Sequence, residues 1–244
     1  MIGRRIAISI PRRLVVETMR LSNEVADIAM VRRMKLGAVV AARAANPTRP
    51  PWTAIFVKAM ALVADDIPAL RQTFVRFPTA HFYQYASSVA AMTIEREFDG
   101  EPAVFLGFAR NPGAMTLSEI AALVRFYSQT PVTEVRDFSR AIKAARRPAL
   151  IRRLILWFGY QLPRLRANYY GTFLVSAVSG LDADATRLRT ITTSLLHYGQ
   201  ISAEGPTDVH LVFDHRLIDG LGGARILERL EQVLNGAIID ELSR

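Results

Sequence analysis

The stretch Val212-Phe-Asp-His-Arg-Leu-Ile-Asp-Gly220 stands between an alternating apolar run and a glycine-rich turn. The alternation over 209–213 predicts a strand, which places His215 just after the strand's end. A neutral imidazole there can take a proton from a thiol or hydroxyl near neutral pH. Asp219 can fix an arginine or the backbone of the turn, and Gly220 lets the chain approach closely before the next helix. From spacing alone, a surface turn with an incidental histidine is the preferred interpretation.

Local signals along the rest of the chain mark a hairpin and several helix ends. Residues 90–98 and 102–108 flank Asp99-Gly100, a signal for a two-residue β-hairpin. Thr116-Leu-Ser-Glu119 matches a capping box at the start of a helix, and Thr130-Pro131 is expected to open another helix. A final amphipathic helix is expected over 223–234, with Gly236 as its stop.

The predicted elements mix strands and helices along the chain. Further helices are expected at 14–21, 36–45 and 53–66, the last capped by Thr53, and further strands at 28–34, 171–176 and 190–198. The predicted class is therefore α+β, with a mixed β-sheet flanked by helices.

The composition narrows the possible functions. The chain has 244 residues, of which 50% are hydrophobic, so a core for one domain over 1–244 is expected. It has no cysteine, which rules out disulfides, thiolate metal sites and cysteine nucleophiles. No secretory signal is recognisable, and the longest apolar run is shorter than the ~20 residues that span a bilayer. A cytoplasmic location is therefore expected.

The charge is positive and unevenly distributed. The formal net charge is +9, and no acidic residue occurs between Asp137 and Asp182. This balance predicts an anionic partner such as nucleic acid, phospholipid or a phosphorylated cofactor. Nucleic acid is not expected, because no recognition motif accompanies the charge. No metal is expected either, since the histidines lack the spacing of metal ligands.

Several segments, in order, resemble the catalytic cores of the acyltransferases of 2-oxo acid dehydrogenase complexes, which share a fold with chloramphenicol acetyltransferase. The stretch 214–220 is similar to that family's His-x-x-x-Asp-Gly signature, and Gly171-Thr-Phe-Leu-Val-Ser176 resembles its Gly-Thr-Phe-Thr-Ile-Ser strand. Weaker similarities are found at 12–22, 53–70 and 194–199. The resemblance implies the chloramphenicol acetyltransferase-like fold and a trimer.

The resemblance also implies roles for individual residues. His215 would be the general base that deprotonates a thiol of coenzyme A or of an acyl acceptor, and Ser176 would stabilise the oxyanion. Asp219 would be structural and pair with an arginine, for which Arg12 is the candidate. In this family the histidine and the serine come from neighbouring subunits. Acyl-coenzyme A is the expected substrate, and the acceptor could be a thiol, a hydroxyl or an amine.

The sequence departs from this family in three ways. No lipoyl domain and no peripheral-subunit-binding domain are expected, so that no lipoyl group is attached and a separate polypeptide could carry the lipoyl arm. The family's Asp-Gly-Leu-Val-Val-Pro stretch is replaced by 99–104. Residues 146–160 place arginines beside a Leu-Ile-Leu-Trp-Phe face, which suits either a peripheral membrane contact or, preferably, a helix packed against the trimer. A non-catalytic trimeric scaffold or membrane-surface protein is therefore the alternative to an acyltransferase.

Overall fold

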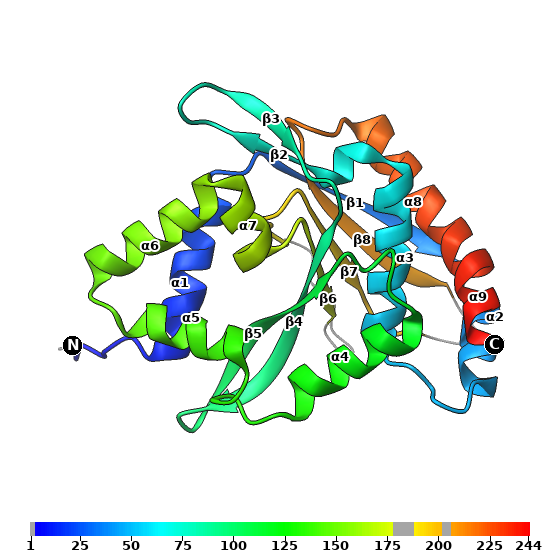
Figure 1. The fold of residues 1–244 in the computed structure, drawn as a ribbon, viewed down its shortest axis with the longest axis horizontal. Coiled ribbons are helices and arrows are strands. Elements are labelled where there is room, and N and C mark those ends of the chain that lie inside the picture. Colours follow the sequence, from blue (N-terminus) through cyan, green and yellow to red (C-terminus); the bar gives the residue numbers. More distant parts are fainter. Residues whose placement is uncertain (1–2, 178–187, 202–205) are drawn as a thin grey trace.

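The computed structural model describes residues 3–177, 188–201 and 206–244, which form a six-stranded mixed sheet covered by helices (Figure 1). The strand order is β1-β8-β7-β6-β4-β5. β6 runs parallel to its neighbours β4 and β7, and the other pairs are antiparallel. The strands are β1 (Asp27–Met34), β4 (Val89–Phe98), β5 (Glu101–Arg110), β6 (Phe173–Ala177), β7 (Ser194–Tyr198) and β8 (Thr207–Asp214). A small second sheet pairs β2 (Gln72–Val75) with β3 (His81–Gln84).

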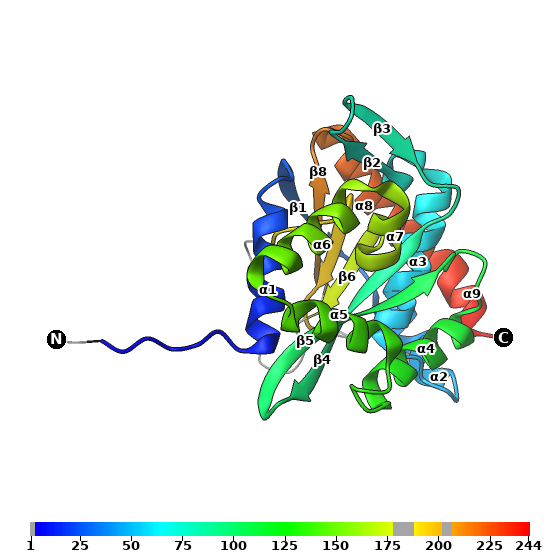
Figure 2. The same cartoon turned by 60° about the vertical axis from the view of Figure 1, so that its left-hand side comes forward.

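Helices lie on both sides of the large sheet, as Figures 1 and 2 show. One side carries α3 (Trp52–Asp66) and α8 (Gly220–Val233). The other side carries α1 (Ile10–Ser22), α5 (Arg136–Arg146), α6 (Ala149–Gln161) and α7 (Pro163–Tyr170). The remaining helices are α2 (Gly37–Ala45), α4 (Leu117–Gln129) and α9 (Ile239–Leu242). The prediction of an α+β fold with a mixed, helix-flanked sheet is confirmed.

The α3 helix lies in the core because its sequence is apolar around most of its circumference. Its Phe56 ring stacks on Tyr198 of β7 at 4.1 Å between ring centroids. Its one buried cation, Lys58, donates hydrogen bonds to the carbonyl oxygens of Gly113 and Met115 at 2.8 and 2.6 Å. These bonds offset the cost of burying the ammonium group and tie the loop before α4 to the core.

Two local predictions are confirmed in detail. Asp99 and Gly100 both have positive φ, 54° and 76°, as the expected two-residue turn between β4 and β5 requires. Thr116 caps α4 in a capping box, in which Glu119 Oε2 accepts a hydrogen bond of 2.7 Å from the Thr116 backbone N–H.

Three predicted helix ends were wrong. Pro51, not Thr53, precedes the first residue of α3, and the Thr53 hydroxyl lies 3.1 Å from that of Tyr198 instead. Thr130 ends α4, because its N–H bonds to Phe126, and the next helix begins only at Arg136 after an isolated turn. Gly236 does not stop the last helix.

The chain continues helically past Gly236, through a π-helical turn over Leu234–Ile238 and into α9. The buried side chains of Leu234, Ile238 and Leu242 lie along this continuation. Their burial outweighs the roughly 1 kcal/mol by which glycine disfavours a helix.

Candidate active site

His215 lies immediately after β8, in a turn that both backbone and side-chain bonds fix. Its backbone N–H donates to the carbonyl oxygen of Ala26 at 2.8 Å, next to the start of β1. Its Nδ1 lies 2.9 Å from the carbonyl oxygen of Ile218. A carbonyl only accepts hydrogen bonds, so this contact assigns the proton to Nδ1 and leaves Nε2 of the neutral ring as an acceptor.

The His215 side chain forms part of the wall of a cavity of about 340 Å³. Most of the other lining residues come from the turn itself, from the start of α8 and from the loop after α3; they include Ile67, Ala69, Leu217, Asp219 and Ile226. The cavity volume lies within the range of small-molecule sites. The imidazole is therefore exposed to a space that a substrate group could enter.

An ion pair that the sequence did not reveal holds the turn on the other side of His215. Asp214 is 1% exposed and accepts hydrogen bonds of 2.8 and 2.6 Å from Nε and an Nη atom of Arg216. These bonds raise the pKa of Arg216, so its guanidinium stays charged. The same guanidinium lies over the Phe74 ring at 4.5 Å. The signal in the sequence is the i, i+2 pair of opposite charges, Asp214 and Arg216, on either side of His215.

Asp219 has a structural position, but with a different partner from the one expected. It is the N-cap of α8, and its Oδ1 accepts a 2.7 Å hydrogen bond from the backbone N–H of Gly222. Arg12 is exposed on α1, and within the described part of a single chain no ion pair joins it to Asp219. Within one chain the partner of Asp219 is thus the backbone of α8, and its pairing with an arginine stays a prediction.

Close approach of the chain depends on Gly223 and not on Gly220. A Cβ added at Gly220 would meet no atom within 4 Å. At Gly223 it would lie 2.5 Å from Cε1 of Phe213 and 2.8 Å from Sδ of Met30. Gly223 therefore lets α8 pack closely on the strands that lead to His215. The expected role was assigned to the wrong glycine, because the sequence cannot show which helix face meets β8.

Ser176 lies on β6, far from His215 within one chain. It is the register partner of His197 on β7, which is the partner of His210 on β8. His215 comes five residues after His210, which at roughly 3.3 Å per residue is about 17 Å along the sheet. The Ser176 Oγ accepts a 3.3 Å hydrogen bond from the Thr93 hydroxyl, which leaves its own hydrogen available for another acceptor.

The other three histidines lie outside this site. His197 and His210 are buried, with ring centroids 5.8 Å apart. His81 is exposed on β3, and its Nδ1 lies 2.8 Å from the carbonyl oxygen of Thr79. Among the residues that the structure describes, no group of three or more His, Cys, Asp or Glu side chains could hold a metal ion.

The basic aromatic segment 146–160 forms the last residue of α5 and most of α6. Arg152 on α6 bonds to Glu17 on α1, with 3.1 Å between its Nε and Oε1. Glu17 is 2% exposed and also pairs with Arg20 at 3.1 Å. Exposed apolar side chains lie on α6 at Leu150, Ile151, Leu154, Ile155 and Phe158. None of the helices in the described ranges is long and apolar enough to cross a membrane.

Solved structures share this fold over nearly the whole chain. The cubic core of the pyruvate dehydrogenase multienzyme complex superposes with a TM-score of 0.70 and 14% identity, over 97% of this chain and 94% of the other. Dihydrolipoamide acetyltransferase from Azotobacter vinelandii gives 0.69 and 14% identity over the same shares. Chloramphenicol acetyltransferase gives 0.52 and 16%, over 99% of this chain and 100% of the other.

The chain therefore has the chloramphenicol acetyltransferase-like fold of the 2-oxo acid dehydrogenase acyltransferase cores, as the resemblance implied. Because the sequence identities are low, this likeness shows a shared fold only. No family model matches the sequence, and no curated protein sequence matches it significantly.

Proposed function

We propose that the protein is a coenzyme A-dependent acyltransferase in which His215 is the general base. The observation that carries the proposal is the contact between His215 Nδ1 and the Ile218 carbonyl, since it leaves Nε2 of the neutral ring unprotonated on a residue that lines the cavity. The Azotobacter vinelandii structure was determined to study a serine, a histidine and an asparagine in that enzyme's mechanism, the asparagine four positions after the histidine. In this chain Asp219 follows His215 by four.

The proposed reaction transfers an acyl group between two nucleophiles. Nε2 of His215 removes the proton of the acceptor thiol, hydroxyl or amine while that atom attacks the carbonyl carbon of the acyl thioester. A tetrahedral intermediate forms, with its negative charge on the former carbonyl oxygen. Its collapse breaks the carbon–sulfur bond, and the departing coenzyme A sulfur takes the proton from the imidazolium. No electron transfer and no metal are needed.

Ser176 is proposed to donate a hydrogen bond to the oxyanion. The hydrogen bond that Ser176 accepts from Thr93 orients its hydroxyl as a donor. Because the register separates Ser176 from His215 by about 17 Å along the sheet, the serine would have to come from a neighbouring subunit. This separation favours a trimer whose active sites lie between subunits, with Asp219 holding the turn of His215 in each.

The acceptor is proposed to be a small molecule or a group on a separate lipoyl or carrier protein. The second candidate function is a non-catalytic scaffold or a membrane-surface protein. The exposed Leu150 on α6 favours that candidate, together with Leu154 and Phe158, which are exposed but also line a cavity beside α6, since exposed apolar patches mark interaction surfaces. The second candidate function predicts that the protein attaches to anionic vesicles and turns over no thioester.

Calorimetry with coenzyme A and a series of short- to long-chain acyl-coenzyme A thioesters tests the proposal, with loss of thioester followed in the same samples. Saturable binding and acceptor-dependent loss of the thioester would support the acyltransferase and define its chain-length range. Absence of binding throughout the series would contradict it and favour the scaffold. Sedimentation with anionic vesicles, run in parallel, measures the membrane attachment that the second candidate requires.

A further inference from the structure

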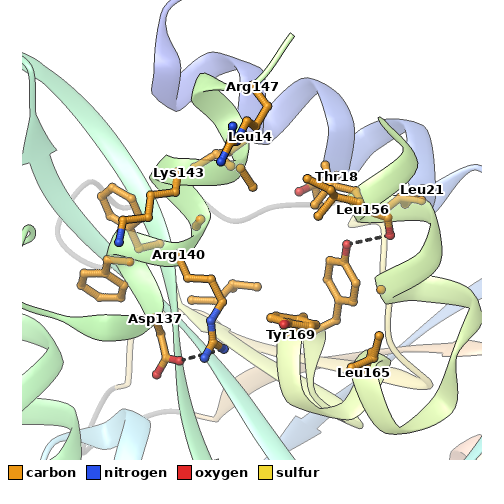
Figure 3. Close-up of a pocket in the computed structure, with 18 of the residues that line it drawn as sticks. Leu14, Thr18, Leu21, Asp137, Arg140, Lys143, Arg147, Leu156, Leu165 and Tyr169 are labelled. Atoms are coloured by element: carbon orange, nitrogen blue, oxygen red, sulfur yellow. Dashed lines mark hydrogen bonds and ion pairs between the residues drawn. The ribbon is translucent and has the colours of Figure 1, made fainter. Parts of the chain in front are cut away.

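A second and larger cavity, of about 670 Å³, lies between α1, β5, α5, α6 and α7 (Figure 3). None of its lining residues belongs to the cavity of His215. Its walls are mainly apolar and include Leu14, Leu21, Leu106, Phe138, Leu156 and Leu165. The volume is in the range of sites for small organic ligands. An apolar space of this size suits an alkyl chain.

Contacts between distant segments hold the walls of this cavity in place. The buried Glu17 on α1 is bonded to Arg152 on α6, as described above. The Tyr170 hydroxyl of α7 donates to the Leu156 carbonyl of α6 at 3.2 Å. The backbone of α6 at Gly159 lies against the rings of Tyr169 and Tyr170, at a distance that would also accommodate a methyl group. The cavity is therefore a built feature of the helix packing.

The wall of the cavity formed by α5 and the residue that follows it is cationic. Arg140, Lys143 and Arg147 line it, and Asp137 is the single carboxylate among its lining residues. The negative charge of Asp137 is already engaged, since Asp137 Oδ2 accepts a 2.7 Å hydrogen bond from Tyr127 and its Oδ1 lies 3.7 Å from Arg140. Figure 3 shows Arg140 and Asp137 together at the side of the cavity near Tyr169.

The cavity shares Arg140, Asp137, Leu165 and Tyr169 with an adjoining hollow of about 410 Å³. Arg110 and Arg136 also line this hollow, with the amide of Asn168. Arg140 is held over the Tyr169 ring at 5.1 Å, where the two spaces meet. Three arginines thus line one hollow beside a single carboxylate, and guanidinium groups are the donors that best match phosphate oxygens.

We propose that these joined spaces bind a single-chain amphiphile with a phosphate monoester head. The alkyl chain occupies the apolar cavity, and the phosphate lies among Arg110, Arg136 and Arg140. A carboxylate head has one charge and fewer acceptor positions, so a fatty acid binds more weakly than the phosphate. The site is separate from the proposed acyl transfer, and His215→Ala should bind the amphiphile like the wild type.

The probe is oleoyl lysophosphatidate, titrated into the full chain by calorimetry below its micelle concentration. We expect saturable binding at one molecule per chain. Arg140→Gln should weaken it about tenfold or more through lost charged hydrogen bonds. Ala144→Phe, which fills the apolar cavity, should also weaken it. Arg164→Gln is the matched control, because Arg164 is exposed on α7 and lines neither space.

Ligands with other head groups test whether the phosphate is recognised. Oleate and a neutral octyl glucoside should bind at least several-fold more weakly than lysophosphatidate, and thermal melts should show that each variant is folded. Equal binding of the three ligands, no binding by the wild type, or unchanged binding by both Arg140→Gln and Ala144→Phe would overturn the proposal. Stronger binding to anionic vesicles than to the monomeric probe would also overturn it, in favour of a membrane-surface role for α6.

Discussion

Nδ1 of His215 lies 2.9 Å from the carbonyl oxygen of Ile218, three residues further along the chain. The turn itself therefore selects the tautomer of the imidazole, without a carboxylate partner. The Asp214–Arg216 pair and the N-cap bond of Asp219 hold the two ends of this turn. The acidic residues around His215 therefore hold the turn that carries it, and the contact of Nδ1 leaves Nε2 of the neutral ring as a hydrogen-bond acceptor.

The separation of Ser176 from His215 predicts complementation between inactive variants. Ser176→Ala and His215→Ala should each lose at least about a hundredfold in kcat, as removal of an oxyanion donor or a general base does. If each site takes its two residues from neighbouring subunits of a trimer, a mixed trimer can contain an intact site. Such a site needs its histidine from the Ser176→Ala chain and its serine from the His215→Ala chain, so random mixing regenerates about one quarter of the sites. Turnover after the two variants are unfolded and refolded together measures this.

The control for complementation is each variant refolded alone at the same total concentration. Recovery of activity only in the mixture would support a shared site. A mixture no more active than the separate variants, with trimers verified by sedimentation, would contradict it.

The buried Asp214 carboxylate should contribute strongly to folding stability. Asp214→Asn removes the charge that neutralises Arg216, and we expect a loss of about 1.5–3 kcal/mol in the free energy of unfolding. Asp208→Asn, on the same strand, removes a partner from the exposed pair with Arg33 and should cost at most about 1 kcal/mol. Urea unfolding of both variants measures the difference, and equal effects would contradict the assignment.

Replacing glycine by alanine should change the stability of the fold in opposite directions at two positions. Gly223→Ala forces a Cβ against the Phe213 ring and should destabilise the fold by about 1–3 kcal/mol. Gly236→Ala meets no atom within 4 Å and lies in a helical continuation, so it should stabilise by about 0.5–1 kcal/mol. Thermal melts show whether each substitution raises or lowers the Tm. Stabilisation by both changes would show that α8 does not pack closely on β8.

The Glu119 carboxylate predicts a pH effect on stability. Hydrogen bonds from the backbone and the hydroxyl of Thr116 lower its pKa below the ordinary value of 4.5. A lowered folded-state pKa gives stability that is present above the ordinary value and is lost as the pH falls through the folded-state value. The difference in Tm between the wild type and Glu119→Gln should therefore shrink as the pH is lowered past 4.5. A difference that does not change with pH would contradict this.

Much of the fold could be predicted from the sequence, because local chemistry determined it. The hairpin at Asp99-Gly100 and the capping box at Thr116 depend on neighbouring residues alone. The prediction at Gly236 was wrong because burial of apolar side chains further along the chain continues the helix, and the prediction at Thr130 was wrong because this residue closes the preceding helix. The large apolar cavity beside α6 could not be predicted, since its walls depend on contacts such as that of Glu17 with Arg152, which are 135 positions apart.

The most direct test of the central claim is the rate of acyl transfer from acyl-coenzyme A to a dithiol acceptor in the wild type, His215→Ala and His81→Ala. His81→Ala is matched in chemistry and lies on an exposed strand outside the site. We expect His215→Ala to lose at least about a hundredfold in kcat with its assembly unchanged, while His81→Ala keeps wild-type turnover. Equal turnover of the wild type and His215→Ala would contradict the assignment of His215 as the general base.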